Sequence, residues 1–298
     1  MRKHAITRLL LIGLIAFSLV LAGCKEEEED TAATDGAPTL PDVGSMTVDF
    51  SDFGGSDTNS SRQLAALMQQ YEAGENIGLP PNYAYPVWGS YYNDAALTVL
   101  VWDVIIAVNF STPVAAFKLA FTQIPVNQGN LTWLWSYSLI GLKTWDVGLT
   151  GQIVGSEVHW DLALTSSTAD VNGCCTDFTW FDGAHSLGQG GYWQFYDHTD
   201  PTAGAKIVRI DWVVTAADQK TLTFTVNSSV PATTYWGNGS YLTYELNGTS
   251  LSMTIKNSAR TNPMIITLDT ITKQGSIRYD DGTTLGCWDG NRDDMTCP

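Results

Sequence analysis

The sequence predicts a mainly β domain, built as an antiparallel up-and-down barrel or a strongly curved sheet, with two or three helices before it. Between Asn130 and Tyr279, about ten short segments alternate apolar and polar residues, and Gly, Asn, Asp or Pro separates them. The chain also holds 11 Trp, 12 Tyr and 10 Phe, which suit the half-buried surface of a sheet. Consecutive strands at hairpin spacing favour the up-and-down arrangement over a sandwich.

Residues 1–23 have the organisation of an export signal. Three basic residues stand before an apolar run from Leu9 to Leu21, and small residues follow the run. The run is about 13 residues long, whereas a membrane-spanning helix needs about 20. The segment is therefore expected to direct export rather than to remain as a transmembrane helix.

The sequence Leu21-Ala22-Gly23-Cys24 resembles the lipobox of bacterial lipoproteins. This resemblance implies that the chain is cut before Cys24, that its thiol is diacylated, and that palmitate or a similar acyl chain is added to the new amino group. Several acyl chains on one residue suffice for stable anchoring. The expected location is the outer membrane, on its periplasmic face or at the cell surface.

An acidic, disordered tether is predicted for residues 24–57. The formal charge of the whole chain is −16, and ten acidic residues lie between Glu26 and Asp57. The run Lys25 to Asp30 is similar to the acidic signal that follows the lipidated Cys in surface lipoproteins of the Bacteroidetes type; a charged spacer on an anionic membrane is the alternative. The strong negative charge makes nucleic acid an unsuitable partner.

A single domain is predicted for residues 58–298, with a helical part over residues 60–123. Ser60 or Ser61 caps the first expected helix, which carries an apolar stripe up to Tyr71. A second apolar helix, or two strands, is expected from Ala95 to Phe110. A third helix is predicted with Pro113 at its first position. The buried Asp103 is expected to need a partner.

The predicted strands place one set of side chains in the core and a polar set on the other face. Because a cavity lined by indoles could hold a lipid, a pigment or an aromatic ligand, five tryptophans are candidates for ligand binding, with simple core packing as the alternative. These are Trp133, Trp135, Trp160, Trp180 and Trp193. Polar residues such as His159, Asp161 and Arg209 are expected on the solvent face.

Four cysteines besides Cys24 are candidates for disulfides in an exported chain. Cys287 and Cys297 enclose nine residues, so a bond between them would hold the C-terminal loop. The adjacent Cys174 and Cys175 could bond each other only in a strained ring, so other partners or free thiols are the alternatives.

Two weaker patterns concern metal binding and hydrolysis. Oxygen-bearing residues recur at every second position in Asp289, Asn291 and Asp293, as in a Ca²⁺ loop, but the glycine and closing glutamate of an EF-hand are missing. His185 and His198 stand near predicted turns, with Asp182 and Asp197 as a conceivable pair of glycosidase carboxylates. No other cofactor is expected.

The mature domain resembles uncharacterised β-rich bacterial lipoproteins in its aromatic strands and its final Cys-Trp-Asp and Cys residues. Gly191-Tyr192-Trp193 also resembles the G-x-W signature of lipocalins, which in that family lies on the first strand rather than in mid-sheet. The expected function is a lipid-anchored, non-enzymatic binding or structural module. The alternative is a surface protein that binds or hydrolyses glycans.

Overall fold

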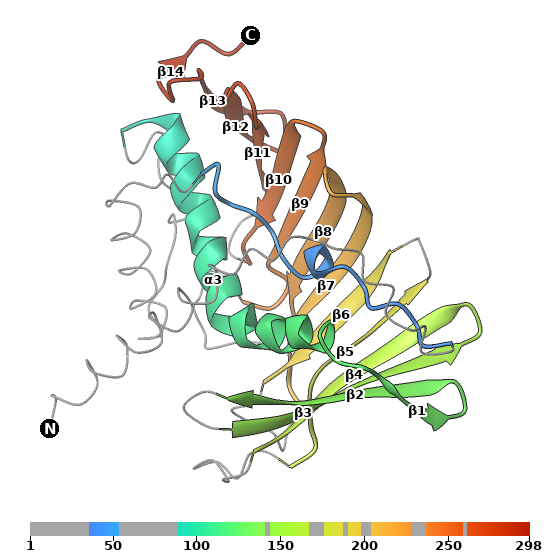
Figure 1. Cartoon of the computed structure of the whole chain (residues 1–298). Helices are drawn as coiled ribbons and strands as arrows, with labels where there is room; N and C mark the ends of the chain where they lie inside the picture. The colour runs from blue at the N-terminus through green and yellow to red at the C-terminus, as the bar shows by residue number, and fades with distance from the viewer. Residues whose placement is uncertain are drawn as a thin grey trace, which may run out of the picture. The chain divides into compact units, whose positions relative to one another are not determined.

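The computed structural model describes residues 36–53, 89–140, 144–166, 176–186, 190–197, 204–227, 237–258 and 261–298. These residues contain a single sheet of 14 antiparallel strands in chain order (Figure 1). The mainly β prediction is confirmed. Among the described residues, β1 and β14 are the two edges of the sheet and do not pair, so the sheet is strongly curved rather than closed into a barrel.

The strands follow the predicted alternation closely. Their bounds are β1 Val126–Gly129, β2 Thr132–Ile140, β3 Thr144–Val154, β4 Glu157–Ser166, β5 Phe178–Ser186, β6 Gly190–Tyr196, β7 Lys206–Ala216, β8 Gln219–Val226, β9 Tyr241–Asn247, β10 Ser250–Lys256, β11 Met264–Asp269, β12 Gly275–Tyr279, β13 Thr284–Trp288 and β14 Asp294–Met295. The inner face of the sheet carries the large apolar side chains. The outer face carries mostly small and polar ones, as in an antiparallel sheet with one solvated face.

The helix α3 (Tyr91–Ala120) lies along the inner face of the sheet (Figure 1). Ser90 caps it, because its side chain accepts a hydrogen bond from the N–H of Asn93. The sequence predicts two helices here, with Pro113 opening the second; the helical character is confirmed, but the start at Pro113 is wrong, because this residue lies inside one continuous helix. Instead, α3 bends by 62° between Ile106 and Phe110, just before Pro113. A proline ring clashes with the carbonyl four residues earlier, which explains a bend at this place.

The curved sheet wraps around α3, so that successive turns of the helix meet strands far apart in the sheet. Near its start, the ring of Tyr92 lies edge-on to Trp288 of β13 at 5.8 Å. Further along, the ring of Phe110 lies edge-on to the ring of Phe195 of β6, with 4.5 Å between the ring centroids. Near its end, Phe117 packs on β5 and β6. The helix is apolar on nearly all sides because the inner face covers most of it.

The segment Gly36–Phe53, called the strap below, also lies on the inner face (Figure 1). Its side chains Met46, Phe50 and Phe53 are buried in the core. The Nζ of Lys220 donates to the carbonyl of Thr47 at 3.3 Å. The sequence predicts a disordered tether as far as residue 57, whereas the structure places the strap on the sheet. These three apolar residues stand at i, i+4 and i+7, a helical spacing, but the strap forms no α-helix over them and buries them as an irregular segment.

No single helix in the described ranges is long and apolar enough to cross a membrane, although the two arms of α3 together meet that length and composition. The predicted helix after Ser61 lies outside the described residues, as do the signal segment, Cys24, the pair Cys174 and Cys175, and His198.

Candidate functional site

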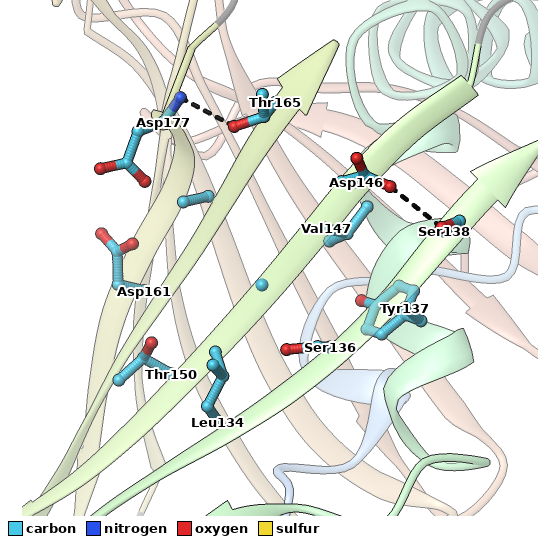
Figure 2. Close-up of a pocket in the computed structure, with 12 residues that line it drawn as sticks. Leu134, Ser136, Tyr137, Ser138, Asp146, Val147, Thr150, Asp161, Thr165 and Asp177 are labelled. Atoms are coloured by element: carbon cyan, nitrogen blue, oxygen red, sulfur yellow. Dashed lines mark hydrogen bonds between the residues drawn. The ribbon is translucent and has the colours of Figure 1, made fainter. Parts of the chain in front are cut away.

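A groove of about 610 Å³ crosses the outer face of the sheet over β2, β3, β4 and the start of β5 (Figure 2). Its floor is a row of three small residues that the strand register places side by side. Ser136 of β2 pairs with Gly148 of β3, and Gly148 pairs with Ala163 of β4. The groove exists because no side chain in this row is larger than a hydroxymethyl group.

Larger residues form the two sides of the groove. On one side, the register aligns Leu134, Thr150 and Asp161. On the other side it aligns Ser138, Asp146 and Thr165, next to Asp177. The lining therefore combines hydroxyl groups with three carboxylates, and the described residues that form it include no Lys or Arg.

Each of the three carboxylate residues is held by a neighbouring hydroxyl group. Ser138 donates from Oγ to Oδ1 of Asp146 at 3.0 Å. Thr179 donates from Oγ1 to Oδ2 of Asp161, also at 3.0 Å. The backbone N–H of Asp177 donates to Oγ1 of Thr165. The first two bonds fix the direction of the carboxylates of Asp146 and Asp161 before any ligand arrives, whereas the third holds only the backbone of Asp177.

Asp161 is the most perturbed acid of the groove. Burial raises the pKa of its carboxyl group, and the charges of Asp182 and Asp177 raise it further, while the hydrogen bond from Thr179 acts in the opposite direction. Asp161 and Asp182 are direct partners in the register of β4 and β5. Two carboxylates that face each other across strands repel, and a positive group between them would relieve that repulsion.

A polar network continues from the groove across β5, β6 and β7. Tyr196 donates its hydroxyl to Oδ2 of Asp182 at 2.7 Å, and this contact together with burial raises the pKa of the Tyr196 phenol. Further along, the guanidinium of Arg209 pairs with Asp211 and lies 4.0 Å over the ring of Tyr192. The positive charge of Arg209 is thus already neutralised and does not serve the groove.

The five candidate tryptophans do not line this groove. Trp133, Trp135, Trp160, Trp180 and Trp193 are between 1% and 8% exposed. The rings of Trp135 and Trp160 pack together at 5.6 Å. The strap covers Trp193, whose Nε1 donates to Oγ of Ser45 at 3.0 Å. Their observed role is to fill the core.

Trp180 is buried in the core as predicted, but the strand around it is irregular. The register of β4 and β5 shifts by one residue, so that Leu162 faces Phe181 while Ala163 faces Thr179. Trp180 is the extra residue of this β-bulge. Strict alternation places Phe178 and Trp180 on one face, and because of the bulge the next residue, Phe181, is buried in the core as well.

The histidines do not form a catalytic cluster with the predicted aspartates. His185 is buried on the inner face, where its Nδ1 accepts a hydrogen bond from Nε1 of Trp160 at 2.9 Å. Burial lowers the pKa of this imidazole. His159 lies on the outer face beside Glu157 at 3.4 Å. The carboxylate opposite Asp182 is Asp161, not Asp197.

The C-terminal loop is organised by its own hydrogen bonds. Cys287 and Cys297 form a disulfide. The carboxylate of Asp289 accepts hydrogen bonds from the N–H groups of Asn291 and Asp293, which makes this stretch an Asx-type turn. Within the described ranges, no three His, Cys, Asp or Glu residues stand close enough together to hold a metal ion.

The sequence does not predict the groove, because the groove depends on three side chains that are merely small. Asp161 is correctly predicted on the solvent face, but Ser136, Gly148 and Ala163 look like ordinary solvent-facing residues. Only the exact pairing of three strands brings them into one row. Hydrophobic alternation determines which face of the sheet a residue occupies, but it does not determine which residue pairs with it on the neighbouring strand.

Comparison with protein-family models, with curated proteins and with solved structures finds no match to this chain.

Proposed function

We propose that this chain is a lipid-anchored protein of the bacterial outer membrane, facing the periplasm or the cell surface, and that it works as a non-enzymatic binding module. The lipobox-like residues ending at Cys24, with the basic and apolar residues before them, support the anchor. The groove on the outer face supports the binding role. This groove is the observation that carries the proposal.

The lining of the groove favours a small, positively charged ligand with hydrogen-bonding groups. Asp146, Asp161 and Asp177 supply negative charge, and the hydroxyl groups between them can donate or accept hydrogen bonds. A cation beside Asp161 would favour the ionised form that burial disfavours. Amines, including amino sugars, have this chemistry. A hydrophobic ligand held by the five tryptophans receives no support, because those side chains are buried.

Intact mass spectrometry of protein extracted from native membranes tests the anchor. A mature chain beginning at Cys24 and carrying acyl chains is expected, and Cys24→Ser should abolish the added mass and release the protein from the membrane. A soluble product that keeps residues 1–23 would contradict the anchor.

Isothermal titration with matched ligands tests the groove. Glucosamine and spermidine should bind, whereas N-acetylglucosamine, which lacks the positive charge, should bind at least about tenfold more weakly, since a charged hydrogen bond contributes about 1.5–3 kcal/mol. Asp161→Asn with Asp177→Asn should weaken spermidine binding. Glu245→Gln, an exposed acid of the outer face on the distant β9, is the matched control. If glucosamine and N-acetylglucosamine bind equally well, the proposal of a cationic ligand is overturned.

Hydrolysis of a glycan is the second candidate, because Asp161 and Asp182 face each other beside the groove and the pKa of Asp161 is raised. Retaining glycosidases use two carboxyl groups about 5–5.5 Å apart, one protonated and one ionised. Release of nitrophenol from a panel of 4-nitrophenyl glycosides, lost in Asp182→Asn, would support hydrolysis. If the wild-type protein releases none, the non-enzymatic proposal stands.

A further inference from the structure

Four exposed aliphatic side chains lie on and beside the edge strand β1, two of them at its turn to β2 and two toward its other end. They are Ile124, Val126, Leu131 and Val154, with exposed fractions of 80%, 61%, 58% and 48%. Leu131 lies in the β1–β2 turn and Val154 ends β3, and the N–H of Ile153 donates to the carbonyl of Leu131, so the two turns are adjacent. This group is called the apolar rim below.

The strands β1 and β2 of the apolar rim carry no charge, whereas Val154 pairs with the exposed Glu157 across β3 and β4. The chain has 31 acidic and 15 basic residues, yet no charged residue occurs between Lys118 and Lys143, which covers β1 and β2 completely. In β3 the single charged residue is Asp146, which lies toward the opposite end of that strand. A surface with no charge can leave water without the large cost of desolvating ions.

The turn at Leu131 has a backbone that a leucine rarely adopts. Asn130 and Leu131 have φ values of 51° and 57°, the arrangement of a type I′ hairpin turn, whose second central position favours glycine. Leu131 is the one aliphatic residue with positive φ among the described residues. A strained conformation that keeps an exposed aliphatic side chain in place points to a role for that side chain.

The chain also enters the domain at this edge of the sheet. A Cβ placed on Gly36 would lie 3.3 Å from the indole of Trp133, which is two residues beyond Leu131. Twelve residues, from Cys24 to Asp35, precede Gly36. Even a fully extended chain of that length reaches only about 40 Å. A lipid on Cys24 would therefore hold this end of the domain close to the bilayer.

We propose that the apolar rim is the membrane-facing surface of the domain and rests in the interface of the bilayer that holds Cys24. This inference depends on the anchor proposed above. The occupant is lipid: the rim is aliphatic and uncharged, the tether is short, and it enters beside the rim. Contact of Leu131 and Val154 with the bilayer fixes which side of the domain faces the membrane and leaves the curved sheet above it.

Hydrogen exchange measured by mass spectrometry tests the apolar rim. Acylated protein in phosphatidylcholine vesicles is compared with the non-acylated Cys24→Ser chain in solution. Amides of residues 126–132 and 153–156 should exchange roughly tenfold more slowly on vesicles, since burial of a few aliphatic side chains is worth at least that factor. The turn around Ile271, equally apolar but distant in the sheet, should not change.

Leu131→Gly combined with Val154→Thr should remove the protection at the apolar rim. Both replacements suit the local backbone, because glycine relieves the positive φ and threonine keeps a β-branched residue in the strand. Ile271→Thr is the matched control and should keep the protection. Unchanged exchange at the rim on vesicles would overturn the proposal. Protection that accompanies dimer formation in solution would also overturn it, since the occupant would then be a second β1 edge.

The experiments distinguish a failure of the lipid-anchor proposal from a failure of the proposal that the apolar rim contacts the membrane. The intact mass reports acylation alone. If no acyl chains are found, a chain with an N-terminal histidine tag in place of residues 1–23 can be held on vesicles by nickel-chelating lipid, and the same exchange comparison then decides whether the rim meets the bilayer.

Discussion

The backbone N–H of Tyr91, in the first turn of α3, donates to Oδ1 of Asp294 in β14 at 2.9 Å, although 203 residues separate them. The last strand therefore caps the helix that the rest of the sheet surrounds. Asp294→Ala should lower the free energy of unfolding by about 1 kcal/mol, because it leaves a helix N–H without its partner and removes a negative charge from the helix start. Chemical denaturation measures this change. Asp293→Ala, an exposed neighbour, should have no comparable effect.

The disulfide between Cys287 and Cys297 holds β14 in place for this contact. Replacing both cysteines with serine should lower the free energy of unfolding by about 3 kcal/mol, the loop-closure entropy of a ring of this size. Exchange of the Tyr91 amide should also become faster, because β14 would detach more often. If the double variant unfolds at the same denaturant concentration as the wild type, the disulfide contributes only locally.

The groove carries a stability cost that depends on pH. The pKa of Asp161 is raised in the folded protein, so folding favours its protonated form, and stability is lost as the pH rises from the ordinary value of 3.8 through the folded pKa. Asp161→Asn should therefore raise the free energy of unfolding by about 0.5–1 kcal/mol at pH 7, a small value because solvent screens a half-buried group. At pH 3 the variant and the wild type should match. A stabilisation that is equal at both pH values would exclude the charge as its cause.

Burial lowers the pKa of His185, and this shift makes the folded protein less stable in acid. Because burial lowers this pKa, the neutral imidazole contributes stability above the ordinary value of 6.5, and this contribution is lost as the pH falls below it. Protonation of Nδ1 would also break the hydrogen bond from Trp160. Between pH 8 and pH 5 the wild type should lose about 1 kcal/mol of stability that His185→Gln keeps. His159→Gln, on the exposed face, should behave as the wild type does.

The sequence predicts the strands well and the parts that depend on long-range contacts poorly. Alternation of apolar residues placed Trp160 and Ile210 in the core, and the structure confirms both. The strap was not predicted because its composition, rich in Thr, Asp, Gly, Ser and Pro, indicates a disordered tether, and only contacts with the distant sheet bury Met46, Phe50 and Phe53. The continuity of α3 through Pro113 was missed because burial on all sides compensates for one lost hydrogen bond. Pairing and packing over long distances decide both features.

The candidate site was predicted only in part, for the same reason. Asp161 was expected to face solvent, but its partner Asp182 follows from the register of β4 and β5. The β-bulge at Trp180 was not predicted, because Phe178, Thr179 and Trp180 fit simple alternation and only the pairing with β4 reveals the extra residue. A groove formed by absent side chains is visible only once neighbouring strands are aligned.

Two glycines of β3 lie on opposite faces of the sheet, one in the groove and one in the core, so substitutions there test the two regions separately. Gly148 lies on the outer face, where an added Cβ would meet only Cδ1 of Leu134 at 3.4 Å. Gly151 lies on the inner face, where an added Cβ would stand 2.6 Å from the ring of the buried Trp160. Gly148→Ala should thus leave stability unchanged or raise it by up to about 1 kcal/mol, whereas Gly151→Ala should lower it by about 1–3 kcal/mol through overpacking.

The larger variant Gly148→Leu then tests the groove itself. Its side chain should occupy the floor between Ser136 and Ala163 and weaken binding of spermidine by at least about tenfold, because it takes the space that the ligand would fill. Denaturation checks that the variant remains folded, and titration calorimetry measures the binding. If Gly148→Leu is stable and binds spermidine as tightly as the wild type, the ligand lies elsewhere on the protein, and the small residues of this row serve only the curvature of the sheet.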